Sequence, residues 1–445
     1  MNALLRFPIG TAACLWAALT PRLGAEAPEA AVAAEPAPAW SLHAQGTVVV
    51  QNHPGFPAAY SGPASLSAQS ETKETVSSDL YAGARLWAGA EAFVDGLAWQ
   101  GFGLSNAVGA AGFPNGEAFR LGTHRPDAIV ARLFVRQTIA LGGEEERGEP
   151  DALTLGGQRA TERLTFTLGK LSVKDIFDNN SYANDPRTQF LNWALMANEA
   201  WDYPADSLGY TTGAAVEWIR PGWAWRYGFF QMPRVSNGLQ LDMHLAKAWG
   251  MVTELERDYQ LGGHAGAVRL LLFGNRAHMG SYQAAVDAAA RPADLVATRA
   301  YRGKSGVGLN FEQALTESLG VFARASWSDG RNESWVFADV DRAVSLGASA
   351  HGRIWGRPDD TLGLAMVGNG IAGAHRQYFA AGGTGILVGD GRLRYGTERI
   401  AEAYYDFKPA RWIAVALDFQ YIANPAYNRD RGPVPVFGAR THLEY

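Results

Sequence analysis

Close to its C-terminus the chain reads WIAVALDFQYIA (residues 412–423), a stretch that shows the pattern deciding the fold. Large apolar side chains at Ile413, Val415 and Leu417 alternate with small or polar side chains at the positions between them. Successive side chains of a β-strand point to opposite faces, so this period of two predicts a strand with one apolar and one polar face. The final stretch, FGARTHLEY (437–445), repeats the alternation.

Segments of this kind recur along most of the chain. We predict strands near 41–51, 78–94, 97–109, 128–141, 162–177, 209–220, 223–234, 247–261, 266–280, 302–317, 319–332, 343–356, 360–373, 397–408, 411–424 and 434–445. An even number of strands is typical of bacterial outer-membrane barrels, and no apolar run long enough for a transmembrane helix follows the first 25 residues. The predicted fold class is therefore all-β, a transmembrane antiparallel β-barrel of about 16 strands.

The connections between these segments alternate in length. After even-numbered strands they are tight, as at Asp95-Gly96, Pro221-Gly222 and Gly262-Gly263. Outer-membrane barrels have short periplasmic turns and long extracellular loops, whereas such long loops are uncommon in compact soluble domains. One connection, 142–161, is long where a turn is expected, and its role stays open. The long connections follow odd-numbered strands, at 52–77, 110–127, 178–208, 281–301 and 374–396.

The N-terminal region differs in amino-acid composition from the rest of the chain. Residues 1–25 carry a short positive start, an apolar stretch and small residues, which predicts a cleaved signal peptide. Residues 26–39 are rich in Ala, Pro and Glu and predict a flexible periplasmic tether. The predicted barrel then covers residues 40–445. We therefore expect a multi-pass protein of a Gram-negative outer membrane, in contact with its lipid.

Composition and motifs exclude several function classes. The chain has 39 Lys+Arg against 44 Asp+Glu and a single cysteine, which disfavours nucleic-acid binding and excludes a disulfide or cysteine–zinc framework. Candidate catalytic side chains such as Ser281, His278 and Asp287 show no recognised spacing. Gly382–Gly385 resembles a phosphate loop but lacks the following Lys-Ser/Thr. We predict no enzyme, no catalytic residue, no cofactor and no metal site.

A barrel of this size has a water-filled lumen, so inward side chains report on the solute that passes. Strand parity predicts mixed charges and aromatics on the inner wall, whereas a simple ion pore favours one sign of charge. The predicted inward residues are Arg85, Trp87 and Glu91 on the second strand, Arg132 and Arg136 on the fourth, and Arg163 on the fifth.

The longest connection, 178–208, is predicted to fold into the lumen and constrict it, because it carries many aromatic and charged side chains. Sugar hydroxyls both donate and accept hydrogen bonds, and the C–H face of a pyranose packs on aromatic rings. These side chains suit sugar contact, although salt bridges that only brace the loop would need the same residue types. The candidates are Asp185, Arg187, Asn192, Trp193, Trp201 and Asp202.

Several long segments resemble the carbohydrate-selective porins of the OprB type. They include GFGLSNAVGAAGFPNGEAFR (101–120), LTFTLGKLSVKDIFDNNSYANDPRTQFLNWALM (164–196) and NPAYNRDRGPVPVFGARTHLEY (424–445). The resemblance extends from about residue 78 to residue 445. It implies facilitated diffusion of glucose-like monosaccharides, without cofactor or energy source, through a constriction lined by arginine and acidic side chains. Arg85, Glu91 and the 178–208 segment match that constriction by position.

Two other functions stay open on the sequence alone. The barrel could be a general diffusion porin or a channel for another small polar solute, because only the constriction distinguishes these classes. It could also anchor the outer membrane to the cell wall through residues 26–39, although that segment carries no recognised wall-binding module. Porins often form trimers, and a homotrimer likewise stays open.

Overall fold

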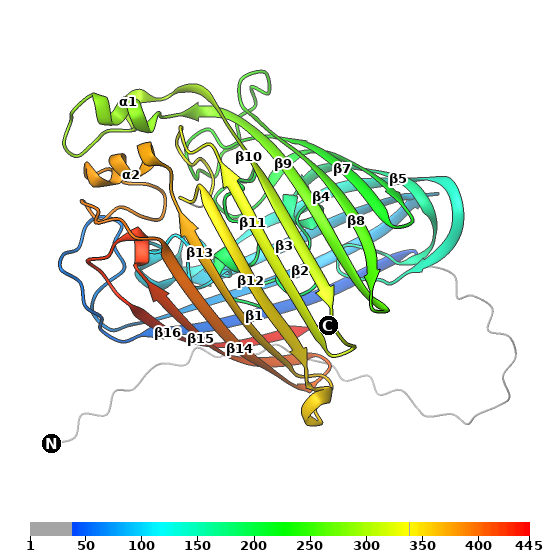
Figure 1. The fold of residues 1–445 in the computed structure, drawn as a ribbon. Helices are drawn as coiled ribbons and strands as arrows, with labels where there is room; N and C mark the ends of the chain where they lie inside the picture. Colours follow the sequence, from blue (N-terminus) through cyan, green and yellow to red (C-terminus); the bar gives the residue numbers. More distant parts are fainter. Residues whose placement is uncertain (1–37, 338) are drawn as a thin grey trace, which may run out of the picture. The chain divides into compact units, whose positions relative to one another are not determined.

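The computed structural model describes residues 38–337 and 339–445, and these residues form a single closed barrel (Figure 1). The predicted signal peptide and all but the last two residues of the predicted tether lie outside the described residues. Each strand pairs antiparallel with its sequence neighbours, and β1 (Trp40–His53) pairs with β16 (Val434–Glu444). Closure pairs every strand and leaves no sheet edge, which a bilayer requires. The predicted fold class is confirmed.

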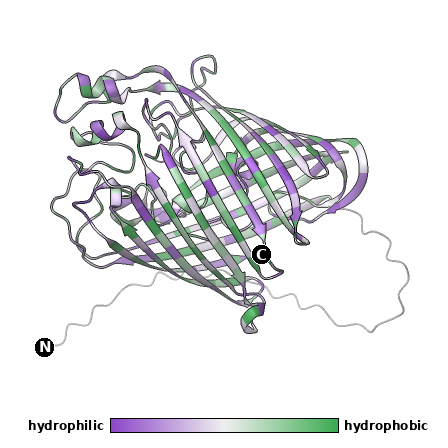
Figure 2. Ribbon diagram, viewed as in Figure 1, coloured by the Kyte–Doolittle hydropathy of each residue, from purple (hydrophilic) through white to green (hydrophobic). Residues whose placement is uncertain are grey.

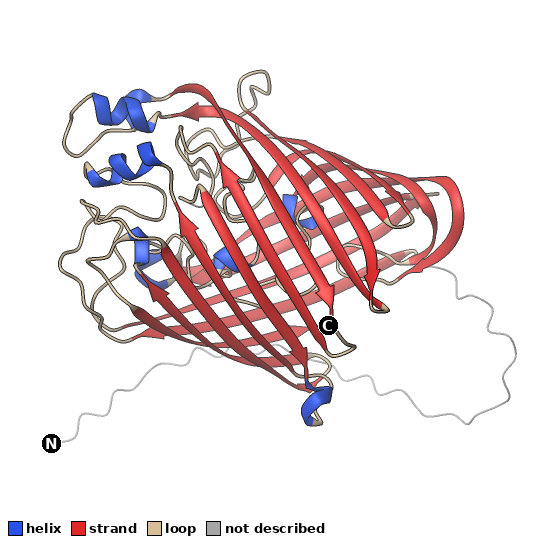
Figure 3. Ribbon diagram, in the orientation of Figure 1, coloured by secondary structure: helices blue, strands red, loops and turns tan. Residues whose placement is uncertain are grey.

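Strands dominate the barrel, and helices are short and confined to its connections (Figure 3). No helix among the described residues is long and apolar enough to cross a membrane. The other strands are β2 (Glu71–Trp87), β3 (Ala90–Gly101), β4 (Thr123–Gly148), β5 (Gly157–Leu171), β6 (Thr211–Arg220), β7 (Trp223–Phe230), β8 (Trp249–Leu261), β9 (His264–Met279), β10 (Ala300–Ala314), β11 (Leu319–Ser328), β12 (Arg342–His351), β13 (Thr361–Gly370), β14 (Glu398–Ala410) and β15 (Ile413–Ala423). The helices are α1 (Tyr282–Asp287) and α2 (Gly373–Ala380), with 3-10 turns η1 (Leu104–Asn106), η2 (Val173–Asp175), η3 (Trp193–Leu195), η4 (Val296–Thr298), η5 (Gly352–Trp355) and η6 (Pro425–Tyr427).

The two faces of each strand differ in the way the alternation predicts. On β15, Ala416 and Asp418 are buried inside the barrel, whereas Leu417 between them is 67% exposed on the outside. Hydrophobic positions recur along the strands in Figure 2. An apolar outer face around a polar interior is the arrangement of a barrel surrounded by lipid.

The second and third strands begin seven residues earlier than predicted, at Glu71 and Ala90 rather than at 78 and 97. The tight turn is therefore Ala88-Gly89, not Asp95-Gly96, and Gly89 adopts a positive φ of 75° there. The first half of β2 was missed because polar residues occupy both of its faces. Asp95 lies within β3, where its buried carboxylate pairs with an arginine of β4.

The 142–161 connection is mostly strand rather than irregular loop. β4 and β5 continue to pair as far as Gly148 and Gly157, so only residues 149–156 connect them. Figure 1 shows this β4–β5 hairpin (cyan) at the end of the barrel opposite α1 and α2. That end carries the short turns and is the periplasmic one.

The connection between β5 and β6, residues 172–210, lies inside the barrel, and we call it the inner loop. Asn192 donates from Nδ2 to Oε1 of Gln420 on β15 at 2.8 Å. Arg440 on β16 donates from Nη1 to the carbonyl oxygens of Pro186 and Gln189 at 2.8 and 2.6 Å. Inward side chains of the wall thus hold the loop across the lumen, as the sequence predicted for 178–208.

Candidate functional site

Asp178 is the central anchor of the inner loop. Its fully buried carboxylate accepts hydrogen bonds from Asn310 Nδ2 at 2.7 Å and from Arg324 Nε at 3.2 Å. Burial alone would raise the pKa of Asp178, but the positive charges of Arg324 and Lys174 outweigh it and lower that pKa. An ionised carboxylate that is fully paired fixes the loop against β10 and β11.

Four of the predicted contact residues of the loop brace it. Arg187 forms ion pairs with Asp79 at 2.8 Å and Glu117 at 3.0 Å, and Asp185 accepts a hydrogen bond from the Arg187 backbone nitrogen. Asn192 bonds to the wall as described above. The carboxylate of Asp202 accepts hydrogen bonds from the backbone nitrogens of Trp335 and Val336, each at 2.8 Å. Of the two roles that the sequence left open, these contacts supply the bracing one.

The two predicted loop tryptophans differ in their surroundings. Trp201 is only 3% exposed and belongs to a hydrophobic cluster with Phe177 and Phe230. Its prediction as a solute-contacting side chain is therefore corrected: it packs in the core of the loop. Trp193 is half-buried, with its ring 5.2 Å from the ring of Phe337.

Arg132 faces the lumen as predicted, but its hydrogen-bonding groups are occupied. Its Nε and Nη2 donate to both carboxylate oxygens of Asp175 at 2.8 Å, and its Nη1 donates to Asp95 at 2.7 Å. The guanidinium also lies 5.9 and 5.2 Å from the rings of Tyr81 and Tyr210. Arg132 therefore ties η2, at the start of the inner loop, to the β3–β4 wall.

Trp87 does not face the lumen. The ladder between β2 and β3 shifts register after Arg85, so Arg85 pairs with Glu91 while Trp87 pairs with Ala90, which lies on the opposite face from Glu91. The Trp87 indole nitrogen donates to Gln137 at 2.8 Å, and the residue is 61% exposed. A bulge of this kind turns a side chain to the other face of a sheet, and strand parity cannot reveal it.

Four predicted wall residues meet in one cavity at the periplasmic end, which we call the inner pocket. Its volume is about 610 Å³. Arg85 and Glu91 form an ion pair at 3.4 Å across β2 and β3, whereas Arg136 has no carboxylate within 4 Å among the described residues. The lining includes Arg85, Glu91, Arg136, Arg163 and Glu217 from the wall, together with residues of the β4–β5 hairpin.

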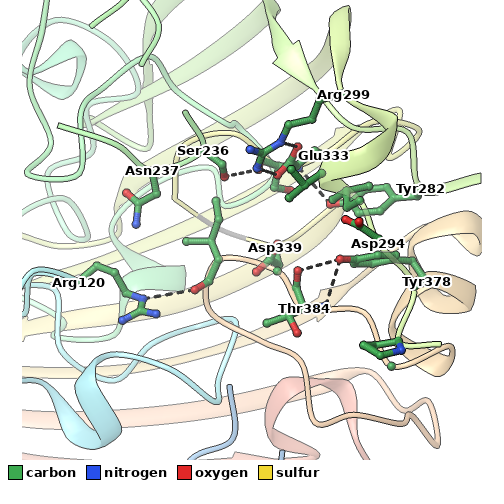
Figure 4. Close-up of a pocket in the computed structure, with 18 of the residues that line it drawn as sticks. Arg120, Ser236, Asn237, Tyr282, Asp294, Arg299, Glu333, Asp339, Tyr378 and Thr384 are labelled. Atoms are coloured by element: carbon green, nitrogen blue, oxygen red, sulfur yellow. Dashed lines mark hydrogen bonds and ion pairs between the residues drawn. The ribbon is translucent and has the colours of Figure 1, made fainter. Parts of the chain in front are cut away.

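A second cavity, the outer pocket, opens among the long loops at the other end (Figure 4). Its volume is about 570 Å³. Figure 4 shows Arg120 and Asn237 on one side, facing Tyr282 and Tyr378 on the other. The polar residues of its lining include Arg120, Ser236, Asn237, Tyr282, Asp294, Arg299, Glu333, Asp339, Tyr378 and Thr384.

Some polar groups of the outer pocket already have hydrogen-bond partners within its lining. Arg299 donates to both carboxylate oxygens of Glu333, at 2.9 and 2.6 Å. These hydrogen bonds raise the pKa of Arg299 above its ordinary value. The Tyr378 hydroxyl donates to the carbonyl oxygen of Thr384 at 2.9 Å and accepts from its backbone nitrogen at 3.1 Å. Burial raises the pKa of Tyr378 to about 12, so its hydroxyl stays protonated at neutral pH.

Other polar groups of the outer pocket retain bonding capacity. Arg120 donates only to the carbonyl oxygens of Ile386 and Asn106, at 3.3 and 3.0 Å, and no carboxylate of the described residues lies within 4 Å of it. The buried Oδ1 of Asn237 accepts no hydrogen bond from the described residues. Neither residue was predicted. Arg120 lies in one of the segments that resemble the OprB type, but Asn237 carries no sequence signal.

Comparison with known proteins places the barrel in a family. The family model described as carbohydrate-selective porin, OprB family, matches residues 64–445. The porin AaxA of Chlamydia abortus is 24% identical over 286 residues, which are 63% of this chain and 54% of that protein. The chain thus spans about half the length of this curated relative.

The solved structures agree on the fold. The high-pH structure of Pseudomonas putida OprB is similar with a TM-score of 0.68 and 17% identity, covering 92% of this chain and 94% of that one. The low-pH structure of the same protein gives a TM-score of 0.50 and 14% identity, over 92% and 93% of the two chains. Both the family and the fold are those of outer-membrane channels rather than enzymes. Because the family model covers most of its length, the chain belongs to the carbohydrate-selective porin family OprB.

Proposed function

We propose that this porin admits glucose-like monosaccharides by facilitated diffusion and that they first bind in the outer pocket. The observation that carries the proposal is the pair of polar groups with unused bonding capacity there. Asn237 Oδ1 is a buried acceptor without a partner among the described residues, and Arg120 is a cation without a carboxylate partner. A sugar hydroxyl donates and accepts at once, so sugar hydroxyls match both kinds of group in this lining, the cation and the amide oxygen.

The size and charge of the outer pocket favour a small neutral solute. Its volume of about 570 Å³ lies within the usual range of small-molecule sites. The charge of Arg299 is neutralised by Glu333, and Asp294 and Asp339 oppose the charge of Arg120. A lining that carries charges of both signs does not select strongly for one sign of ion, and both kinds of charged group bond well to hydroxyl groups.

The inner loop, which is braced against the wall, supports the part of the proposal that concerns facilitated diffusion. It lies inside the barrel, bonded to β15 and β16 as well as to β10 and β11, and so narrows the lumen. Facilitated diffusion needs contacts that are weak enough to release the solute. Arg132 on the wall and Arg187 on the inner loop already pair with carboxylates, so neither can hold a passing hydroxyl tightly.

The proposal is tested by glucose block of the ionic current in two variants. Asn237→Gly removes the acceptor and tolerates the positive φ of 48° at this position, and Arg120→Gln removes the unpaired cation. Each variant loses about one hydrogen bond to the sugar, so we expect the glucose concentration for half-block to rise roughly 3- to 10-fold.

The matched control is Arg353→Gln, which removes an exposed arginine from the periplasmic end of the barrel. It should leave glucose block unchanged. If Asn237→Gly and Arg120→Gln also leave the block unchanged, the outer pocket is not a sugar site. A wild-type channel that glucose does not block would reduce the protein to a general diffusion porin.

A further inference from the structure

The β4–β5 hairpin folds back into the periplasmic end of the barrel instead of extending from it. Its ladder shifts register at Gly142, and Gly142 and Gly143 adopt positive φ values of 136° and 81°. A Cβ atom on Gly143 would lie 2.4 Å from the Thr161 hydroxyl, so the bend requires glycine there. Residues 149–156, which we call the hairpin tip, follow this bend.

An apolar side chain anchors the hairpin tip inside the lumen. Leu155 is fully buried and belongs to the same hydrophobic cluster as Phe93 and Phe134. These two phenylalanines lie opposite each other on the inward faces of β3 and β4. Leu153 packs against the same cluster. A tip that extended into the periplasm would leave both leucines in water.

Arginines of the wall hold the backbone of the hairpin. Arg136 donates from Nη1 to the carbonyl oxygen of Leu153 at 2.7 Å, and Arg85 donates from Nη2 to the carbonyl oxygen of Gly156 at 3.1 Å. Arg163 adds an ion pair at 3.0 Å to Glu146 on the hairpin arm. Three arginines that the sequence assigned to a solute constriction therefore secure the hairpin.

The hairpin forms one side of the inner pocket at the periplasmic end of the barrel. Gly148, Thr154 and Gly156 of the hairpin line this cavity of about 610 Å³ together with Arg85, Glu91 and Glu217 of the wall. The hairpin thus narrows the lumen a second time, in series with the inner loop.

We propose that the β4–β5 hairpin is an exit-side size filter that retains solutes larger than a monosaccharide. The sugar part of this inference rests on the proposed function, but the narrowing itself acts on every solute, including ions. Leu155 is its positioning residue, because its burial keeps the tip in the lumen. The filter also explains why this one periplasmic connection is long.

The direct test removes the filter. Residues 143–161 are replaced by Asn-Gly between Gly142 and Glu162, which pair in the ladder, and Asn-Gly suits a two-residue hairpin turn. We expect single-channel conductance in KCl to rise about twofold or more, since conduction through a pore follows its narrow points. The permeation rate of maltose relative to glucose, measured by liposome swelling, should rise as well.

A point variant tests the anchor without shortening the chain. Leu155→Gln places a polar amide among apolar side chains, which releases the tip and raises conductance in the same direction. Its control is Glu144→Gln, which introduces the same residue on the exposed arm and should conduct like the wild type. Heat-modifiable gel mobility verifies that each variant folds.

Folded variants that conduct like the wild type, with an unchanged maltose-to-glucose ratio, would overturn the filter. That outcome leaves the proposed function intact, because glucose block in the outer pocket does not involve the hairpin. Conversely, raised conductance in a channel that glucose fails to block would support the narrowing and reject the sugar proposal. If the truncated chain does not fold, the Leu155→Gln result alone decides.

Discussion

Individual side chains of the lumen serve mainly to keep the pore in shape. Strand parity predicted that Arg132 points inward, which is correct, but it could not predict which partners Arg132 has. Asp95 comes from the neighbouring strand and Asp175 from the start of the inner loop. Pairing partners depend on how distant segments fold together, so sequence identifies the wall residue and leaves its role open. The contacts of Trp201 and Arg187 could not be predicted for the same reason: Trp201 packs in the core of the loop, and Arg187 pairs with Asp79 and Glu117.

Replacing Arg132 should destabilise the barrel strongly. Arg132→Gln leaves Asp95 and Asp175 in the wall without their cation, and removing one partner of a buried pair costs about 3–5 kcal/mol. The urea midpoint of unfolding in detergent micelles should fall accordingly. Arg353→Gln, which breaks an exposed pair worth about 0–1 kcal/mol, should barely shift it. Equal midpoints in the two variants would show that Arg132 is not a brace.

Strands were predicted well where the sequence pattern that defines them lies within a short segment. The strands from β6 to β16 begin within a few residues of their predicted positions, because alternation and tight turns are properties of short segments. The start of β2 shows no alternation, because polar residues occupy both of its faces, and the exposed polar arms of the β4–β5 hairpin resemble a loop in sequence. The outer pocket could not be predicted, because Arg120, Asn237 and Asp339 come from three different loops.

Acid should loosen the helices that border the outer pocket. His375 on α2 pairs with Asp341 at 2.9 Å and stacks on Tyr282 of α1 with ring centroids 3.9 Å apart. Burial alone would raise the pKa of Asp341, but the positive charge of His375 and its hydrogen bond lower it to about 2. The pKa is thus lower in the folded state than the ordinary value of 3.8, so this stabilisation is present above about pH 4 and is lost between pH 4 and 2.

Proteolysis of the long loops, followed between pH 6 and pH 2.5 with an acid-stable protease, measures this loosening. Cleavage near α2 should increase below about pH 4 in the wild type. Asp341→Asn cannot ionise and should be cleaved equally at both ends of the range. Wild-type cleavage that does not change with pH would contradict the assigned role of the Asp341–His375 pair.

At the scale of the whole molecule, the outer pocket and the β4–β5 hairpin lie at opposite ends of the barrel, and the inner loop lies inside it. Closure into a sixteen-stranded barrel was predictable, because strand number, apolar outer faces and unequal connections all indicate the same architecture. The order of the three features depends on how loops fold into the lumen. We propose that selectivity for one class of solute depends on these three features together and not on any single residue.

The most direct test of sugar selectivity is single-channel current through wild-type protein in a planar bilayer, with glucose, maltose or an uncharged linear polyol of glucose size added in turn. We predict concentration-dependent block by glucose, weaker block by maltose and none by the polyol, because only the pyranose presents its hydroxyls in a fixed ring. Open channels that none of the three solutes blocks, or that glucose and the polyol block equally, would contradict a sugar-binding lumen.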